Sequence, residues 1–289
     1  MEIVHKIDDV RRIISEAKRS GKKVGFVPTM GFLHDGHISL VEISKSYSDF
    51  QVMSIFVNRL QFNDINDFKT YPKDLQRDIE KAKAGGVDLL FVPDDSEMYK
   101  NNLTTVDVAL LTDNLCGAHR PGHFKGVFTV VSKLFNIVQP DVAVFGQKDI
   151  QQAVSLEKMV FDLNFPIKMI IGPIKRESDG LAMSSRNKHL SEKERKDALA
   201  LYSSLQKCEE ILKSGENKAE KIIAEMTSVI KSGNPTKIDY ISVVNYEDLQ
   251  PVSHIQSKSV IAVAAFWGTT RLIDNMIVHV DGSSYKFIY

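Results

Sequence analysis

Short apolar segments that alternate with helical periods place the strongest constraint on how this chain folds. Each of five segments is apolar almost throughout, which is typical of a β-strand buried on both faces of a sheet. Between the third and fourth, apolar residues recur at steps of three and four from Val127 to Val138, which predicts a helix that ends before Pro140. The pattern predicts an α/β fold, a Rossmann-like parallel sheet with flanking helices. The predicted strands are Lys23–Val27, Gln51–Val57, Val87–Val92, Asp141–Phe145 and Ile167–Ile171.

A second, smaller domain is predicted after the fifth strand. The pattern of apolar strand segments stops at Gly172-Pro173. A charged helical stretch then begins with Ser191 and Glu194 at the spacing of a capping box. We therefore expect a Rossmann-like domain over 1–173 and a smaller α+β domain over 174–289. The elements predicted in the second domain are helices over about 191–213 and 217–232 and strands at Ile238–Val244, Val260–Phe266 and Leu272–Val280.

The charge balance excludes several kinds of partner. Lys and Arg together number 37, Asp and Glu also number 37, and the formal net charge is zero. A chain without a basic excess lacks the global field that drives binding to nucleic acid or to acidic membranes, although local patches can still exist. We expect neither nucleic acid nor a membrane as a partner.

Cysteine usage and the amino-terminal sequence predict a cytoplasmic protein. Cys116 and Cys208 are too few and too far apart for a disulfide framework, which fits a reducing compartment. Met1–Asp9 carries acidic residues where a secretory signal has a basic start. The longest apolar stretch, Val260–Trp267, is much shorter than the roughly 20 residues that span a bilayer.

The first predicted strand leads into the segment with the strongest chemical signal. After Pro28-Thr29-Met30-Gly31 the chain reads His34-Asp35-Gly36-His37, and a helix is predicted from about His37. In an open α/β sheet this junction favours anions, because the N–H groups and the dipole of a helix amino terminus point toward the ligand. His34 and His37 could both donate to one phosphate there. Each histidine alone is more simply a surface or packing residue.

Polar residues follow two other predicted strands. Asn58 and Gln61 come after the second strand, where amides can both donate to a carboxylate and accept from a hydroxyl; ordinary loop amides are the alternative. Gly146, Lys148 and Asp149 come after the fourth strand, at the start of a helix. A lysine opposes the helix dipole at that position, so its presence favours an anionic ligand that compensates.

Two further segments could bind either a metal or an anion. Cys116, His119 and His123 have the spacing of one half of a zinc site. No companion Cys/His pair at metal-ligand spacing occurs elsewhere, although His34 and His37 could in principle converge with them. In the alternative interpretation, Arg120 offers its guanidinium to a carboxylate or phosphate. The run Ser184-Ser185-Arg186, at the predicted domain boundary, could clamp a phosphate, although such a triplet often occurs by chance.

Together these segments resemble one enzyme family. His34-x-Gly36-His37 resembles the signature of the nucleotidyltransferase superfamily, and Pro28-Thr29-Met30-Gly31 is similar to the pantothenate synthetase (pantoate–β-alanine ligase) family. The matching segments follow in family order from Pro28 to Asn187, and Thr270–Asn275 matches a strand near the carboxyl terminus. Five linked motifs in order carry much more weight than one.

The resemblance implies an ATP-dependent ligase that condenses pantoate with β-alanine through a pantoyl adenylate and releases AMP and pyrophosphate. It implies ATP with Mg²⁺, the metal being held mainly by phosphates and water, and a homodimer. Residues 1–173 would bind ATP and pantoate, and residues 174–289 would act as a lid. Sequence leaves open whether His37 is a general acid or only a phosphate donor.

The resemblance also assigns roles residue by residue. The catalytic residues implied are His34, His37, Lys148 and Arg186. The ATP contacts implied are Met30, Gly31, His34, Gly36, His37, Gly146, Lys148, Asp149, Lys175, Met183, Ser184, Ser185 and Arg186. The substrate contacts implied are Asn58, Gln61, Arg120, His123 and Gln152. Together with Arg176, the cations among them predict a locally positive pocket within a chain of zero net charge.

The sequence departs from the family at Arg59-Leu60, where the family usually has proline-threonine, and this raises the question of how stiff the loop is. Position 175 is usually apolar in the family and is Lys here. Three other functions are weighed against the ligase: a nucleotidyltransferase that joins a phosphorylated metabolite to a nucleotide, a zinc-dependent hydrolase or zinc-stabilised binding module, and a non-catalytic nucleotide-binding domain.

Overall fold

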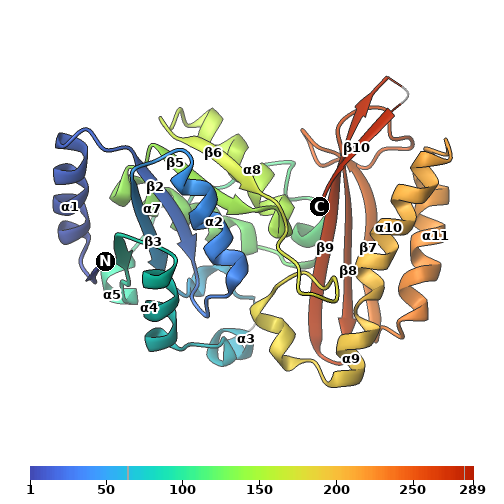
Figure 1. The fold of residues 1–289 in the computed structure, drawn as a ribbon, viewed down its shortest axis with the longest axis horizontal. Helices are drawn as coiled ribbons and strands as arrows, with labels where there is room; N and C mark the ends of the chain where they lie inside the picture. The colour runs from blue at the N-terminus through green and yellow to red at the C-terminus, as the bar shows by residue number, and fades with distance from the viewer. Residues whose placement is uncertain (64, 283) are drawn as a thin grey trace. The chain divides into compact units, whose positions relative to one another are not determined.

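The computed structural model describes residues 1–63, 65–282 and 284–289 (Figure 1). The chain divides into two compact units. Unit 1 comprises Met1–Ala109, His119–Gly146 and Ser155–Gly172, and unit 2 comprises Leu110–Ala118, Gln147–Val154 and Pro173–Tyr289. The chain therefore passes into unit 2 twice before residue 173. That residues 174–289 form a separate domain and act as a lid stays a prediction.

Unit 1 is built on a six-stranded parallel sheet in the order β1-β4-β3-β2-β5-β6, which confirms the predicted Rossmann-like α/β class. All five predicted strands are present. The additional strand, β1, has only three residues, too few for a recognisable sequence pattern, and pairs with β4 at the edge of the sheet. The strands are β1 (Glu2–Val4), β2 (Val24–Thr29), β3 (Phe50–Ile55), β4 (Leu89–Phe91), β5 (Val142–Gly146) and β6 (Lys168–Gly172).

Helices cover both faces of this sheet. Val27 and Met53 pack with Leu40 of α2 (Asp35–Lys45) and Ala82 of α4 (Leu75–Ala84) in one core cluster. Alternate strand residues face the other way, where Phe145 meets Phe135 of α7 (His123–Val138), with a ring separation of 6.3 Å. The remaining helices and 3₁₀ turns up to β6 are α1 (Ile7–Arg19), η1 (Arg59–Gln61), α3 (Ile65–Thr70), α5 (Asp95–Met98), α6 (Leu115–His119), η2 (Gln147–Asp149) and α8 (Ile150–Asp162).

Unit 2 contains a four-stranded antiparallel sheet in the order β10-β9-β8-β7, with α10 and α11 packed on it (Figure 1). The three predicted strands are present, and the hairpin strand β10 was not predicted. It has only five residues, and its pairing with β9 defines it. The elements are η3 (Ser185–His189), α9 (Glu192–Asp197), α10 (Ala200–Lys213), α11 (Ala219–Ser232), β7 (Lys237–Asn245), β8 (Ser259–Trp267), β9 (Thr270–Asp281) and β10 (Ser284–Ile288).

The single helix predicted over 191–213 is wrong in one respect, because it is broken between α9 and α10. The capping box at its start is confirmed: Ser191 Oγ accepts from Glu194 N at 3.3 Å, and Glu194 Oε2 accepts from Ser191 N at 2.8 Å. The break follows from tightened turns, in which Leu199 N bonds to Lys196 O and Leu201 N bonds to Ala198 O. Apolar periodicity continues through such a turn and does not reveal it.

Within the described ranges, no helix has both the length and the apolar character that crossing a membrane requires.

Candidate active site

Residues 30–37, which comprise the turn after β2 and the first residues of α2, carry the two predicted histidines and are called here the histidine loop. Two successive residues are left-handed, Gly31 at φ 83° and Phe32 at φ 51°. A Cβ at Gly31 would lie 2.9 Å from both Asp78 Oδ2 and the Ile55 side chain, so glycine is needed for space as well as for conformation. The loop therefore packs tightly against β3 and α4.

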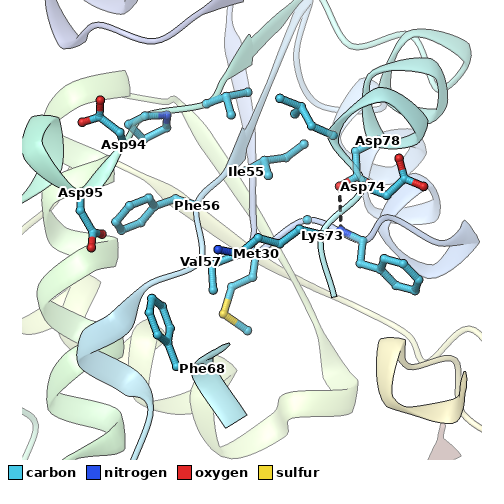
Figure 2. Close-up of a pocket in the computed structure, with 15 residues that line it drawn as sticks. Met30, Ile55, Phe56, Val57, Phe68, Lys73, Asp74, Asp78, Asp94 and Asp95 are labelled. Atoms are coloured by element: carbon cyan, nitrogen blue, oxygen red, sulfur yellow. Dashed lines mark hydrogen bonds between the residues drawn. The ribbon is translucent and has the colours of Figure 1, made fainter. Parts of the chain in front are cut away.

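Asp78 of α4 holds the histidine loop by its backbone. Its carboxylate accepts from Phe32 N at 2.7 Å, the bond that is dashed in Figure 2. It also accepts from Leu33 N at 2.6 Å, and the residue is 2% exposed. Burial raises the pKa of Asp78, and the two N–H groups act in the opposite direction. Sequence analysis missed this residue. A signal was present, since Asp78 lies one turn before Ala82 on the apolar face of its helix.

His34 and His37 lie side by side at the amino terminus of α2. Their ring centroids are 4.0 Å apart, and the planes are tilted by 36°. His37 Nδ1 accepts from the backbone N of His34 at 3.2 Å. Because Nδ1 is the acceptor, a neutral His37 carries its proton on Nε2, the nitrogen that could donate to an anion. Both side chains are half-buried.

Asn58 and Gln61 form a connected pair with Met30. Asn58 Nδ2 donates to Gln61 Oε1 and to Gly126 O, both at 3.0 Å, and Gln61 Nε2 lies 3.2 Å from Met30 Sδ. Asn58 Oδ1 accepts from Tyr99 Oη, and Asn58 is only 1% exposed. Protein partners thus occupy Asn58, whose geometry suits orienting Gln61. Direct contact of either amide with substrate stays a prediction.

The side chains of Arg120 and His123 both contact the backbone carbonyl oxygen of Gln61. His123 Nδ1 donates to Gln61 O at 2.6 Å, and Arg120 lies 3.3 Å from the same oxygen. The neutral His123 ring then accepts on Nε2, which is 3.3 Å from Arg120 NH1. His123 is 7% exposed. Arg120 and His123, which sequence analysis expected to contact substrate, thus contact Gln61. Direct contact of Arg120 or His123 with substrate stays a prediction.

Arg59 and Leu60, where the sequence departs from the family, lie in a turn with local side-chain contacts. These residues form the 3₁₀ turn η1 with Gln61, and Arg59 Nε lies 3.5 Å from Asp95. The Arg59 guanidinium also lies over the Tyr99 ring at 5.3 Å. Arg59 thus makes one charged and one aromatic contact at a position where the family usually has a proline.

A cavity of about 290 Å³ opens at the carboxyl ends of β2, β3 and β4 (Figure 2). Met30 belongs to its wall and, through Sδ, also contacts Gln61. Parallel strands commonly bind ligands at this edge of the sheet. The other side chains labelled in Figure 2 are Ile55, Phe56, Val57, Phe68, Lys73, Asp74, Asp78, Asp94 and Asp95.

In unit 2, the predicted phosphate-binding lysine lies in the short turn between β5 and α8. β5 ends at Gly146, and Lys148 lies in η2, with Nζ 4.0 Å from Asp149 Oδ2. The Lys148 side chain is 21% exposed and that of Asp149 57% exposed, so both reach the surface of unit 2. Gln152 follows on α8 and is half-buried.

Residues 174–186, called here the Arg176 hairpin, carry the remaining predicted nucleotide contacts. Met183 N donates to Lys175 O at 2.9 Å, and the chain then reaches Ser184, whose Oγ accepts from Arg186 N at 3.2 Å as the cap of η3. Met183, Ser184, Ser185 and Arg186 are half-buried, whereas Lys175 is exposed.

Arg176, which sequence analysis counted among the cations of a positive pocket, is paired with a buried carboxylate, and its place in such a pocket stays a prediction. Its guanidinium makes two bonds to Asp274, at 2.7 and 3.1 Å, and Asp274 is 2% exposed. The buried carboxylate neutralises this charge inside unit 2. A partner almost 100 residues away in sequence cannot be recognised from local pattern.

The zinc interpretation finds no support in the side-chain contacts. Cys116 Sγ accepts from Arg271 NH1 at 3.7 Å, and His123 Nδ1 donates to a backbone carbonyl. Over 1–63, 65–282 and 284–289, no group of three or more His, Cys, Asp or Glu side chains could hold a metal ion.

Each unit thus assembles its own set of predicted residues. Unit 1 joins Met30, Asn58, Gln61, Arg120 and His123 by direct contacts and pairs the two histidine rings. Unit 2 carries Lys148, Asp149, Gln152 and the Arg176 hairpin. That the two sets converge on one substrate stays a prediction.

Comparison with known sequences identifies the family. The pantoate-beta-alanine ligase family matches residues 2–277. The chain belongs to this family. A pantothenate synthetase from Thermoanaerobacter sp. (strain X514) is 55% identical over 278 residues, which cover 96% of this chain and 98% of the relative. Another, from Acetivibrio thermocellus, is 50% identical over 97% of this chain and its own full length.

Solved structures agree with the family assignment. A pantothenate synthetase from Thermus thermophilus superposes with a TM-score of 0.90 at 41% identity, over 95% of this chain and 98% of that one. A pantoate-beta-alanine ligase from Francisella tularensis, complexed with beta-gamma ATP and β-alanine, gives a TM-score of 0.78 at 35% identity over 95% and 97% of the two chains. The chain is accordingly a ligase that joins pantoate to β-alanine. This activity excludes the nucleotidyltransferase, the zinc-dependent protein and the non-catalytic nucleotide-binding domain as alternatives.

Proposed function

We propose that the chain drives this ligation with ATP in two steps. A carboxylate oxygen of pantoate attacks the α-phosphorus of ATP, and pyrophosphate leaves. The amine of β-alanine then attacks the acyl carbon of pantoyl adenylate and loses a proton, and AMP leaves with the bonding electrons. The observation that carries the proposal is the pair His34 and His37, 4.0 Å apart at a helix amino terminus, in a chain of this family.

Charge stabilisation is the main task proposed for the site. Negative charge builds up on the phosphates as the adenylate forms, and fixed donors stabilise it without having to reorganise. His37 would donate through Nε2, since Nδ1 is already an acceptor. A single donor of this kind is typically worth about 10²–10³ in rate. The other donors proposed are His34, Lys148, Ser184, Ser185 and Arg186.

Pantoate would be held by Gln61 and Gln152, as the family resemblance implies. Gln61 is oriented by Asn58 at its side chain and by Arg120 and His123 at its carbonyl, so we assign these three residues a supporting role. An oriented amide places the carboxylate for in-line attack, which is how positioning lowers a barrier.

Mg²⁺ is expected to accompany ATP, and the residues present fit it. In ATP sites the ion is bound by phosphates, waters and one or two carboxylates rather than by a protein cage. Asp149 supplies a suitable exposed carboxylate next to Lys148. When bound, Mg²⁺ neutralises phosphate charge; the proposed roles of Lys148 and Arg186 are to hold the phosphates in place.

The resemblance supports three broader proposals. We propose a homodimer located in the cytoplasm, and we propose that residues 174–289 close on the nucleotide held by residues 1–173. Closure of this kind would shield the mixed anhydride of pantoyl adenylate from water.

The activity is tested by AMP release that depends on both pantoate and β-alanine. Turnover with either one alone would overturn the proposed chemistry, and stoichiometric zinc that survives chelation would revive the zinc alternative. A pH–rate profile of His37→Gln addresses the open role of that ring. Loss of one limb supports a general acid, whereas a uniform fall supports a phosphate donor only.

Lys148→Ala tests the phosphate role. We expect pantoate-dependent ATP–pyrophosphate exchange to fall by at least about 10² while the fold is retained, because one fixed cation is lost from the phosphates. Lys158→Ala is the matched control, since Lys158 is an exposed lysine of α8 that pairs with Asp162. Near-normal exchange in the Lys148 variant would refute its role.

A further inference from the structure

Two adjacent side chains of β9 are buried and polar, and the proposed chemistry assigns them no role. Asp274 is 2% exposed and Asn275 is 1% exposed. Asp274 and Asn275 are the last two residues of the segment Thr270–Asn275. This segment resembles the family, but sequence analysis assigned it no role. Burying such groups costs free energy unless they are hydrogen-bonded, so their partners indicate what they do.

Asn275 holds the turn that carries the predicted phosphate lysine. Its Nδ2 donates to Gln147 O at 2.9 Å and to Lys148 O at 3.0 Å. Gln147 returns a bond from Nε2 to Asn275 Oδ1 at 3.3 Å and also donates to Ile288 O at 2.9 Å. Gln147 is itself 1% exposed. The backbone of Lys148 is thus attached to β9 by a buried amide.

Asp274 holds the Arg176 hairpin. Besides its two bonds to Asp274, Arg176 NH1 donates to Gly180 O at 3.1 Å, across the hairpin turn. The guanidinium also lies over the Tyr202 ring at 3.9 Å. Asn275 N donates to Asp274 Oδ1 at 2.8 Å, which links the two anchors. One dipeptide therefore reaches both segments of unit 2 that carry predicted ATP contacts.

We propose that Asp274 and Asn275 are positioning residues for the ATP half of the reaction. Because both lie on β9, they fix the position of Lys148 relative to the Ser184–Arg186 run. The inference rests on the proposed function, because it requires those residues to bind the nucleotide. A displacement of about 1 Å at a reacting group can cost about 10² in rate, so a backbone anchor of this kind affects activity without touching substrate.

The test compares Asn275→Ala with wild type in three measurements. These are the Kd for a non-hydrolysable ATP analogue, the rate of pantoate-dependent ATP–pyrophosphate exchange, and the KM for β-alanine in the full reaction. We expect the Kd to rise about tenfold or more, which corresponds to about 1.4 kcal/mol, and exchange to fall by about 10–100-fold. The KM for β-alanine should stay within about twofold. Asp274→Asn should show the same ATP-specific pattern.

Asp239→Asn is the matched control for lost stability. Asp239 is a buried carboxylate of the same sheet, 3% exposed at its side chain, and it pairs with Arg271 of β9 at 2.8 Å. We expect the midpoint of thermal unfolding of the Asp239→Asn variant to fall, while the Kd of this variant for the ATP analogue stays at the wild-type value. Asn275→Ser, which keeps one donor, replaces the alanine variant if that variant does not fold.

The outcomes separate this inference from the proposed function. An unchanged Kd for the analogue in folded Asn275 variants overturns the inference. It is also overturned if affinity for the analogue and for β-alanine falls equally in these variants, or if Asp239→Asn raises the Kd for the analogue as much as Asn275→Ala does. If wild type shows no pantoate-dependent exchange, the proposed function fails, whereas the Kd comparison still decides whether Asn275 positions a nucleotide site.

Discussion

The histidine loop and the Arg176 hairpin are each held by one buried aspartate, but through different groups. Asp78 accepts directly from two backbone N–H groups of its loop. Asp274 accepts from a side chain, the guanidinium of Arg176. Burial raises the pKa of both carboxyls, and in Asp274 the Arg176 charge acts against that rise.

The difference bears on how each segment can move. Asp78 bonds directly to two backbone N–H groups, so no side-chain torsion of the histidine loop lies between the carboxylate and the loop backbone. The Arg176 hairpin is attached through a long side chain whose torsions can absorb a backbone shift while the ion pair survives. We therefore expect a preformed histidine loop, whereas the hairpin can follow small shifts of the nucleotide while it stays attached to Asp274.

The largest effect on stability is expected for Asp274→Ala. The substitution leaves the Arg176 guanidinium, whose side chain is 12% exposed, without its counter-charge. Breaking a buried pair in this way costs about 3–5 kcal/mol. Urea unfolding of wild type and variant measures the loss. A loss below about 1 kcal/mol, the range of exposed pairs, would show that the hairpin does not depend on this anchor.

Asp78→Ala is expected to have a smaller effect on stability and a large effect on rate. Phe32 N and Leu33 N lose their acceptor, at about 1–3 kcal/mol for each buried donor, and removal of the buried charge offsets part of this. We expect a net loss of about 2 kcal/mol. Displacement of His34 and His37 should lower pantoate-dependent exchange by about 10². An active variant would break the comparison, since the loop would then hold its shape without the carboxylate.

The pH dependence of stability should distinguish the charged from the neutral side chain at position 78. The folded-state pKa of Asp78 is raised, so its charge destabilises the fold above that pKa. This destabilisation is lost as the pH falls through the raised pKa toward the unfolded value of about 3.9. Wild type should therefore gain stability relative to Asp78→Asn between about pH 7 and about pH 4. Urea unfolding of both proteins across this range checks the sign, and a constant difference would contradict it.

The smallest effect is expected at the half-exposed ion pairs of the Arg176 hairpin. Arg195 NH2 lies 2.8 Å from Glu177 and 2.7 Å from Asp179, with side chains 32–34% exposed. Solvent screens such pairs, so Glu177→Gln should cost at most about 1 kcal/mol by thermal unfolding. A loss as large as that of Asp274→Ala would move the main anchor of the hairpin from the buried pair to these exposed ones.

Local sequence signals predicted the elements that hold the site better than they predicted its anchors. The five strands of the parallel sheet and the capping box at Ser191 were found because burial on both faces and N-terminal capping act within a few residues. β1, β10 and the break after α9 were missed, since pairing and turn geometry define them. The residues of the histidine loop stood out because a strand end, glycines and imidazoles are adjacent in sequence.

The sequence by itself determined the fold class, the order of the motifs and the family, because each depends on short-range patterns in a fixed order. Only the tertiary structure decided that Asp78 supports the histidine loop, that Arg176 is neutralised by Asp274, and that Asn275 holds Lys148. Those contacts join residues 46, 98 and 127 positions apart. Polar groups that are so far apart in sequence become partners only when the chain folds. Folding buries them together, and in a buried environment an unpaired polar group costs free energy.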